Sequence, residues 1–232
     1  MGLRPAWGGP ALGRLTKVQL VLASNNAKKL AELRTLFASL PLELLTQGAL
    51  GIDEAEEPHA TFLENALAKA RHAARQSGGA AIADDSGLCV TALGGAPGVA
   101  SAVFAPLPAA LAGDREQSRA AQDAANNALL LQRLAGVTDR RACFVSVLVA
   151  LRGADDPQPL VATGRWDAEI LHAPRGHGGF GYDPLVWIPS LRASVAELDA
   201  EVKNAMSHRA RAAAQMFGLM RDGWLLGATL RG

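Results

Sequence analysis

Short apolar runs alternate with stretches of helical periodicity along this chain, and that alternation leaves few folds open. Residues 18–23 form an apolar run that indicates a buried strand, and residues 27–40 carry leucine and phenylalanine at helical spacing. A second amphipathic stretch, residues 61–76, precedes another short apolar run at 80–83. The order strand, helix, helix, strand predicts an α/β protein.

The second half of the chain predicts antiparallel pairing within the same sheet. Residues 141–151 and 160–171 are β-rich and are joined by Gly153-Ala154-Asp155-Asp156-Pro157, which is typical of a long hairpin. Helices are expected at 116–134 and 207–221. A hairpin combined with strand-to-helix units predicts a central mixed β-sheet flanked by helices.

Length and composition favour one well-packed domain. The 232 residues are 49% hydrophobic and 19% charged, which fits a single domain over 17–232, or two closely packed lobes, after a flexible Gly/Pro-rich leader at 1–16. The net charge of +1 provides no overall field for nucleic acid or an anionic membrane, so we expect neither partner.

Cellular location is predicted from what the sequence lacks. The leader has no apolar core of signal-peptide length, and no later stretch approaches the roughly 18 apolar residues of a membrane span. Cys89 and Cys143 both lie in apolar runs without metal-ligand spacing, so we interpret them as reduced core residues. These features predict a cytoplasmic protein.

A candidate phosphate site lies where the first strand meets the first helix. The turn Ser24-Asn25-Asn26-Ala27-Lys28-Lys29 places free backbone N–H groups and the positive end of a helix dipole beside two lysines. The alternative is that Asn26 only caps the helix and that the lysines are solvated.

Acidic residues follow in two groups. Asp84-Asp85-Ser86-Gly87 is expected at the end of the buried strand 80–83, and Glu54-Ala55-Glu56-Glu57 precedes the second helix. Mg²⁺ binds through few carboxylates plus substrate phosphates, so carboxylates near a phosphate-binding turn predict a magnesium site. An ordinary turn and a solvated acidic loop are the alternatives.

A third group of residues suits a nucleobase. Residues 176–184 contain four glycines that allow close backbone approach, with the flat rings of Phe180 and Tyr182 between them. Lys203, His208 and Arg209 place donors around the start of the last helix. A flexible hairpin and a solvated helix start remain the alternatives.

Taken in order, these motifs resemble the inosine triphosphate pyrophosphatase family, which hydrolyses non-standard purine nucleoside triphosphates to monophosphate and pyrophosphate. The resemblance spans about Val18 to Phe217. It rests on Ser24-x-Asn26-x-x-Lys29, Glu56-Glu57, Thr61-Phe62-x-Glu64-Asn65-Ala66, Ala83-Asp84-Asp85-Ser86-Gly87-Leu88, Gly94-Gly95-Ala96-Pro97-Gly98, Gly178-Gly179-Phe180-Gly181-Tyr182-Asp183-Pro184 and Ser207-His208-Arg209.

The resemblance implies an elongated two-lobed α/β fold, a nucleotide cleft between the lobes, a homodimer, Mg²⁺ as cofactor, and ITP, dITP or XTP as substrate. Matched by position, Glu57 and Asp85 would bind Mg²⁺, and Asp85 would also be the catalytic base. The resemblance leaves the role of Asp84 open. The substrate-binding residues it implies are Ser24, Asn25, Asn26, Ala27, Lys28, Lys29 and Lys69 at the phosphates, and Ser86, Phe180, Gly181, Tyr182, Asp183, Lys203, His208 and Arg209 around the nucleoside.

Two residues depart from the family pattern. Ala100 stands where the family usually has an aromatic residue, and Val103 where it has arginine, which affects one substrate or interface contact. Two other functions stay open: a related septum-inhibition type of pyrophosphatase acting on dTTP or UTP, and a nucleotide-sensing or RNA-binding module without turnover. The Phe180–Pro184 turn speaks against the first, and the retained acids against the second.

Overall fold

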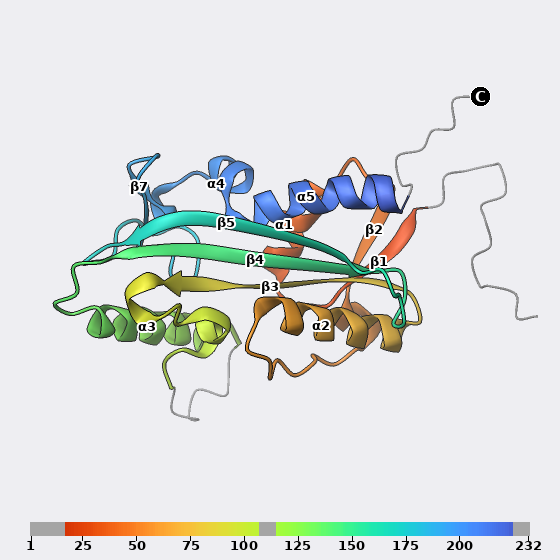
Figure 1. Cartoon of the computed structure of the whole chain (residues 1–232), viewed down its shortest axis with the longest axis horizontal. Helices are drawn as coiled ribbons and strands as arrows, with labels where there is room; N and C mark the ends of the chain where they lie inside the picture. Colours follow the sequence, from red (N-terminus) through yellow and green to blue (C-terminus); the bar gives the residue numbers. More distant parts are fainter. Residues whose placement is uncertain (1–16, 107–114, 225–232) are drawn as a thin grey trace, which may run out of the picture.

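The computed structural model describes residues 17–106 and 115–224, with the side chains of Lys28, Arg115 and Glu116 also outside the description. The predicted leader at 1–16 lies outside the described residues. The molecule is elongated along the direction of its long strands (Figure 1).

A seven-stranded sheet runs through the molecule in the order β2-β1-β3-β4-β5-β6-β7. The strands are β1 (Val18–Leu22), β2 (Leu42–Thr46), β3 (Ala80–Val90), β4 (Arg141–Leu151), β5 (Leu160–Ile170), β6 (Val186–Ile188) and β7 (Ala193–Ser194). β1 pairs in parallel with β2 and β3, and every later pairing is antiparallel. The predicted mixed sheet is therefore confirmed.

Helices cover both faces of this sheet. They are α1 (Ala27–Leu36), α2 (Phe62–Ser77), α3 (Arg115–Arg133), α4 (Ala200–Met206) and α5 (His208–Gly223), with short 3₁₀ turns η1 (Gln47–Leu50), η2 (Thr91–Leu93), η3 (Gly98–Val103) and η5 (Val195–Glu197). α2 and α3 lie along one side of the long strands, and α5 lies along the other (Figure 1). No helix in the described segments is long and apolar enough to cross a membrane.

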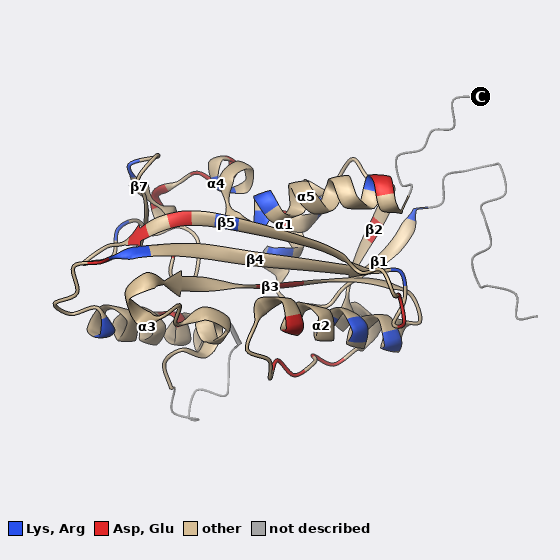
Figure 2. Cartoon of the chain, in the orientation of Figure 1, with Lys and Arg blue, Asp and Glu red and all other residues tan. Residues whose placement is uncertain are grey.

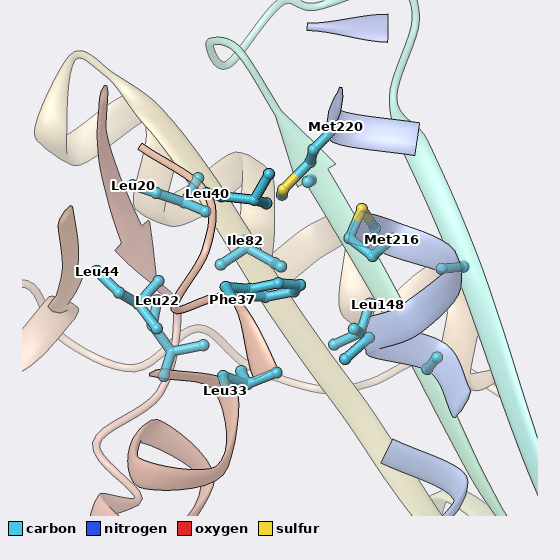
Figure 3. Packing of buried hydrophobic residues seen from close by; sticks show 14 residues of the cluster. Leu20, Leu22, Leu33, Phe37, Leu40, Leu44, Ile82, Leu148, Met216 and Met220 are labelled. Carbon is cyan, nitrogen blue, oxygen red and sulfur yellow. The ribbon is translucent and has the colours of Figure 1, made fainter. Parts of the chain in front are cut away.

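The core between α1, α5 and the sheet is built from large side chains. Phe37, directly after α1, lies among Ile82, Leu148 and Met216, which come from β3, β4 and α5 (Figure 3). This cluster joins the first helix of the chain to the last one. It therefore fixes the positions of the residues that α1 and α5 carry towards β3.

The core under α2 is built from small side chains. Ala66, Ala70, Ala73 and Ala74 are fully or almost fully buried against β1, β3 and β4. Methyl groups allow the helix to approach the sheet closely, because no longer side chain separates the two. Lys69, on the same helix, is thereby brought directly onto the sheet.

Glycine permits the equally close approach of α5. A Cβ atom at Gly164 of β5 would lie 1.8 Å from the backbone oxygen of His208 and 2.6 Å from the backbone nitrogen of Ala212. No neighbour can give way there, since both contacts are backbone. Gly164 therefore determines where α5 begins.

Three sequence predictions need correction. The strand expected over 80–83 continues to Val90, so Asp84 and Asp85 lie inside β3 and not at its end. The helix expected over 27–40 ends at Leu36, since the chain turns into β2, which the sequence analysis did not predict. The helix expected over 207–221 is His208–Gly223 and is preceded by a separate short helix, α4.

Other predictions are confirmed. β4 and β5 form the expected long hairpin, with Ala150 opposite Leu160 at its turn end. α2 and α3 match the helices expected over 61–76 and 116–134 within one residue. Cys89 and Cys143 are free cysteines, the first half-buried and the second buried.

Candidate active site

Two consecutive acidic residues, Asp84 and Asp85, lie in the middle of β3, between α2 on one face of the sheet and α5 on the other (Figure 2). Because side chains alternate across a strand, Asp84 and Asp85 point to opposite faces of the sheet. Asp84 contacts Arg209 of α5, and Asp85 contacts Lys69 of α2. Both are buried, at 1% and 5% exposure.

Every oxygen of the Asp84 carboxylate has a partner. Oδ2 lies 2.9 Å from Lys29 Nζ and 3.1 Å from Arg209 Nε, and Oδ1 accepts from Ser146 Oγ at 2.7 Å. Burial alone would raise the pKa of Asp84, but Lys29 and Arg209 outweigh it and hold that pKa well below its usual range. Asp84 is therefore ionised at neutral pH and joins α1, β4 and α5.

Most N–H donors of the Arg209 guanidinium bond to the protein itself. Nε donates to Asp84, Nη1 lies 2.5 Å from Glu32 Oε2, and Nη2 donates to Ser86 Oγ at 3.1 Å. Burial lowers the pKa of Arg209, but the carboxylates of Asp84 and Glu32 have the larger, opposite effect, so that this pKa lies above its ordinary value. These three contacts leave two of its five N–H groups for a base edge, the role that the resemblance implied.

The other carboxylate is only half satisfied. Asp85 Oδ1 accepts from Lys69 Nζ at 2.9 Å, and the same ammonium lies 3.2 Å from Glu57 Oε1. Asp85 Oδ2 is buried and has no hydrogen-bond partner among the described residues. Burial raises the pKa of Asp85, and the opposing effect of Lys69 does not cancel it. One acceptor atom is thus left for a further proton or cation.

These residues fit a magnesium ion. The Lys69 ammonium already brings Glu57 and Asp85 to the same cation, so the two carboxylates that the sequence analysis paired do lie together. The unpartnered Asp85 Oδ2 is the type of oxygen that Mg²⁺ prefers. Within residues 17–106 and 115–224 no group of three His, Cys, Asp or Glu is placed so that it could hold a metal ion.

A pocket of about 110 Å³ lies beside this acid pair. Its lining combines residues of the predicted phosphate turn with Glu57, one of the two predicted metal ligands, while Asp85 lies next to the pocket through its bond to Lys69. The lining residues are Ala23, Ser24, Lys29, Gln47, Glu54, Ala55, Glu57, Lys69 and Asp84. The pocket therefore places cationic side chains from α1 and α2 against carboxylates. Such a mixture suits a phosphate chain bound together with a divalent ion.

The turn at the head of α1 is held by its own side chains. Asn26 Oδ1 accepts from the Lys29 N–H at 3.2 Å, and Ser24 Oγ accepts from the Asn26 N–H at 3.1 Å. Asn25 links the turn to neighbouring loops through Gly48 and Glu54. Asn26 thus caps the helix, and the same capping fixes the turn at the pocket. Ala27 is exposed, and the Lys28 side chain lies outside the described residues.

On the expected nucleoside side, Asp183 organises the turn. Its Oδ2 accepts from Lys203 Nζ at 2.6 Å and from the Phe180 N–H at 2.9 Å, and the Lys203 ammonium lies 4.5 Å from the Phe180 ring centroid. Burial raises the pKa of Asp183 despite Lys203. The structure brings Phe180, Asp183 and Lys203 together, as the resemblance implied.

His208 lies between the two halves of the site. Its ring stacks on Phe144 with centroids 4.8 Å apart, and its Nδ1 has no hydrogen-bond partner among the described residues. Burial first, and Arg209 second, lower the pKa of His208 well below its ordinary value. A neutral imidazole has one donor and one acceptor, which suits the mixed edge of a purine.

Two residues of this network were missed by sequence reasoning. Glu32 pairs with Arg209, and it lies one helical turn after Lys29, so the pair marks one polar face of α1. Ser146 interrupts an otherwise apolar β4 and bonds to Asp84. A lone hydroxyl in a fully buried run was a visible signal, because a buried polar group needs a partner.

Comparison with known proteins gives consistent matches over most of the chain. The family model described as Ham1 family matches residues 20–219. A dITP/XTP pyrophosphatase of Methylibium petroleiphilum is 70% identical over 210 residues, which cover 90% of this chain and 100% of the relative. One of Leptothrix cholodnii is 66% identical over 211 residues, covering 90% and 100%.

Solved structures agree with the sequence matches. The Coxiella burnetii HAM1 protein superposes with a TM-score of 0.79 at 40% identity, covering 88% of this chain and 99% of that one. The Staphylococcus aureus Ham1 protein gives a TM-score of 0.74 at 34% identity, with the same coverage.

Proposed function

The chain belongs to the Ham1 family, and from this membership we propose that it is a nucleoside triphosphate pyrophosphatase that hydrolyses dITP, ITP and XTP to the monophosphate and pyrophosphate, with Mg²⁺ as cofactor. Such an activity removes non-standard purines from the nucleotide pool before they enter DNA or RNA. Relatives that carry the name dITP/XTP pyrophosphatase support the substrate class.

One observation carries the mechanism: a half-satisfied buried carboxylate beside a pocket lined by lysines. Asp85 keeps Oδ2 without a partner while Lys69 holds Oδ1. A carboxylate with a raised pKa and one oxygen that has no hydrogen-bond partner among the described residues can accept a proton from water. We therefore assign Asp85 as the base for the water that attacks the α-phosphorus.

The remaining residues of the pocket bind and orient the triphosphate. Lys29 and Lys69 offer positive charge to the phosphate oxygens, and Ser24 lies at the head of α1, where the helix dipole favours an anion. Mg²⁺ held by Glu57 and Asp85 would supply further positive charge for the leaving pyrophosphate. Hydrolysis by in-line attack requires this positioning more than it requires covalent chemistry.

Base selection is assigned to the group around His208. Phe180 is expected to stack on the purine, and Lys203, His208 and the remaining N–H groups of Arg209 to meet its polar edge. A 6-oxo group would accept from these donors, whereas the amino group of adenine would leave buried donors unpaired. Such a mismatch discriminates by several orders of magnitude in comparable sites.

A substrate panel tests this proposal. Purified protein with Mg²⁺ is incubated with ITP, dITP, XTP, GTP, ATP and dTTP, and pyrophosphate and orthophosphate are measured separately. We expect pyrophosphate from the first three, and none when the metal is removed with EDTA. Release of orthophosphate alone would exclude cleavage between the α and β phosphates.

The same panel decides between the alternatives. Preference for dTTP would favour the pyrimidine-directed pyrophosphatase, and binding without any hydrolysis would favour the nucleotide sensor. We also propose a single domain over 17–232, a homodimer as the working unit and a cytoplasmic location, as the family resemblance implies. Sedimentation of the purified protein tests the dimer, and Val103, which is 68% exposed, is a position to substitute in that test.

A further inference from the structure

Helix α3 carries a polar face that the proposed mechanism does not use. Gln122 and Asn126 reach the loop after η3, where Asn126 Oδ1 accepts from the Ala105 N–H at 2.8 Å. Asp123 and Asn127, one position further along the helix, reach a different segment. Four polar residues at i, i+1, i+4 and i+5 thus form a polar face in the middle of α3, while Leu130 and Leu131 near its end pack into the core.

Asp123 and Asn127 both bond to the backbone of one residue, Gly181: one to the peptide group before its Cα atom and the other to the peptide group after it. Asp123 Oδ2 accepts from the Gly181 N–H at 2.8 Å, and Asn127 Nδ2 donates to the Gly181 carbonyl oxygen, also at 2.8 Å. The Oδ1 of Asn127 is buried and has no partner among the described residues. Among the described residues, the side-chain amide of Asn127 therefore bonds to Gly181 alone.

Gly181 needs this support because of its conformation. Its φ is +62°, a left-handed value that glycine adopts freely and leaves freely. Holding the N–H and the C=O from the same helix fixes the backbone on both sides of the Cα atom. Phe180 precedes this Cα atom and Tyr182 follows it, so the direction of the Phe180 ring depends on the Gly181 backbone.

The turn is anchored on its other side as well. Tyr182 Oη donates to the Ser101 carbonyl oxygen at 2.9 Å, and Asp183 accepts from the Phe180 N–H. In the described part of the chain, the side-chain hydrogen bonds to the Gly181 backbone come from α3. Since a charge-assisted bond from Asp123 is stronger than a neutral one, its loss is expected to loosen the turn.

We propose that Asp123 and Asn127 are positioning residues for the nucleobase: they hold the Gly181 backbone so that Phe180 and Asp183 are already oriented when the purine arrives. This inference rests on the proposed function, because it takes the Phe180–Asp183 turn as the base-binding segment. Neither residue lines the pocket assigned to the phosphates, so we expect their effect to be confined to recognition of the base. Pre-orientation lowers the ordering cost of binding.

The test uses the full chain with Asp123→Ala, Asn127→Ala, Asn127→Asp and Asp123→Asn. Asn127→Asp keeps the size of the side chain and removes the donor, while Asp123→Asn keeps an acceptor and serves as the rescue variant. Gln132→Ala, on the exposed side of α3, is the matched control. Hydrogen exchange of a peptide spanning 176–185 measures the hold on Gly181 directly.

For the two alanine variants and Asn127→Asp we expect faster exchange in that peptide, a KM for dITP raised about tenfold, and kcat within about twofold of the unmodified enzyme. Asp123→Asn and Gln132→Ala should keep KM within about threefold. Unchanged exchange, or faster exchange with unchanged KM, would overturn the inference. So would a fall in kcat alone.

Calorimetric binding of inosine monophosphate separates this inference from the proposed function. If the unmodified protein binds the monophosphate without hydrolysing dITP, and Asn127→Ala weakens that binding about tenfold, the positioning role stands and the hydrolase proposal fails. If dITP is hydrolysed but all variants bind inosine monophosphate with equal affinity, the hydrolase proposal stands and the positioning role fails. Absence of both binding and hydrolysis overturns both.

Discussion

Asp84 and Asp85 are neighbours in one strand, yet the two faces of β3 treat them differently. On the α5 face, Asp84 meets two cations and a serine hydroxyl, and its pKa is lowered. On the α2 face, Asp85 meets one lysine that it shares with Glu57, and its pKa is raised. Both carboxylates are buried, so the difference comes from their partners and not from exposure to water.

Two neighbouring residues of one strand therefore suit different roles, one stabilising the fold and the other reacting. A carboxylate with every oxygen paired contributes to stability and has no lone pair left for a reaction. A carboxylate with one unpartnered buried oxygen costs stability and gains reactivity. The strand provides both because its side chains alternate between faces.

The largest effect is expected from a substitution of Asp85, the carboxylate with the unpartnered oxygen. Asp85→Asn removes the base while keeping the shape, so we expect kcat for dITP to fall about 1,000-fold. The free energy of unfolding should change by less than about 1 kcal/mol, because Lys69 keeps Glu57 and the buried charge is gone. Pyrophosphate release and urea denaturation measure the two quantities, and a large loss of stability would contradict the comparison.

Asp84→Asn is the matched change on the other face. It leaves Lys29 and Arg209 as buried cations without their shared carboxylate, so we expect a loss of about 3 kcal/mol in the free energy of unfolding. The activity of the protein that remains folded should fall only about tenfold. If urea denaturation finds Asp84→Asn more stable than Asp85→Asn, the assignment of roles is wrong.

Lys69→Met sharpens the comparison on the α2 face. Lys69 contacts both carboxylates of the proposed metal site, so its removal leaves a more negative site without a competing cation. We expect Mg²⁺ to raise the melting temperature at about tenfold lower concentration than in the unmodified protein, since about 1.4 kcal/mol of competition is removed. Arg71→Met, exposed on the same helix, should leave the Mg²⁺ midpoint unchanged.

The smallest expected effect concerns His208, which lies on the Asp84 side of the sheet. Its pKa is lower in the folded protein than in the unfolded chain, so below about pH 6.5 the unfolded chain binds more protons and stability falls with falling pH. The slope contributed by His208 is at most about 1.4 kcal/mol per pH unit. His208→Gln should flatten the melting temperature between pH 6.5 and 5, and an unchanged slope would contradict this.

The sequence predicted elements with a strong local pattern. The β4–β5 hairpin carries long β-rich runs around a Gly/Asp/Pro turn, and α2 carries both a helical period and a Thr61 cap, so local physics was enough. The continuation of β3 through Asp84 and Asp85 was not predictable in this way. Two acids normally end a strand, and here Lys29, Arg209 and Lys69, distant in sequence, make it favourable to bury them.

The site residues also divide into those with a local sequence pattern and those defined by distant contacts. Motif order predicted the phosphate turn, the acids and the Phe180–Asp183 turn as parts of one site, because each motif is contiguous in sequence. The partners Glu32, Ser146 and Asn127 were missed, since each is a single polar residue whose meaning depends on a contact across the sheet or between helices. Only Ser146, a single hydroxyl in an apolar run, carried a local signal, because a buried polar group needs a partner.

The bond between Arg209 and Glu32 spans 177 positions of the chain. At a synthesis rate of roughly 5 to 20 residues per second, α5 leaves the ribosome roughly 10 to 35 s after α1. Until then the first half of the protein presents its phosphate turn and its acids without the arginine that ties them together. In the proposed mechanism the nucleotide site is therefore complete only once the final helix has packed against α1.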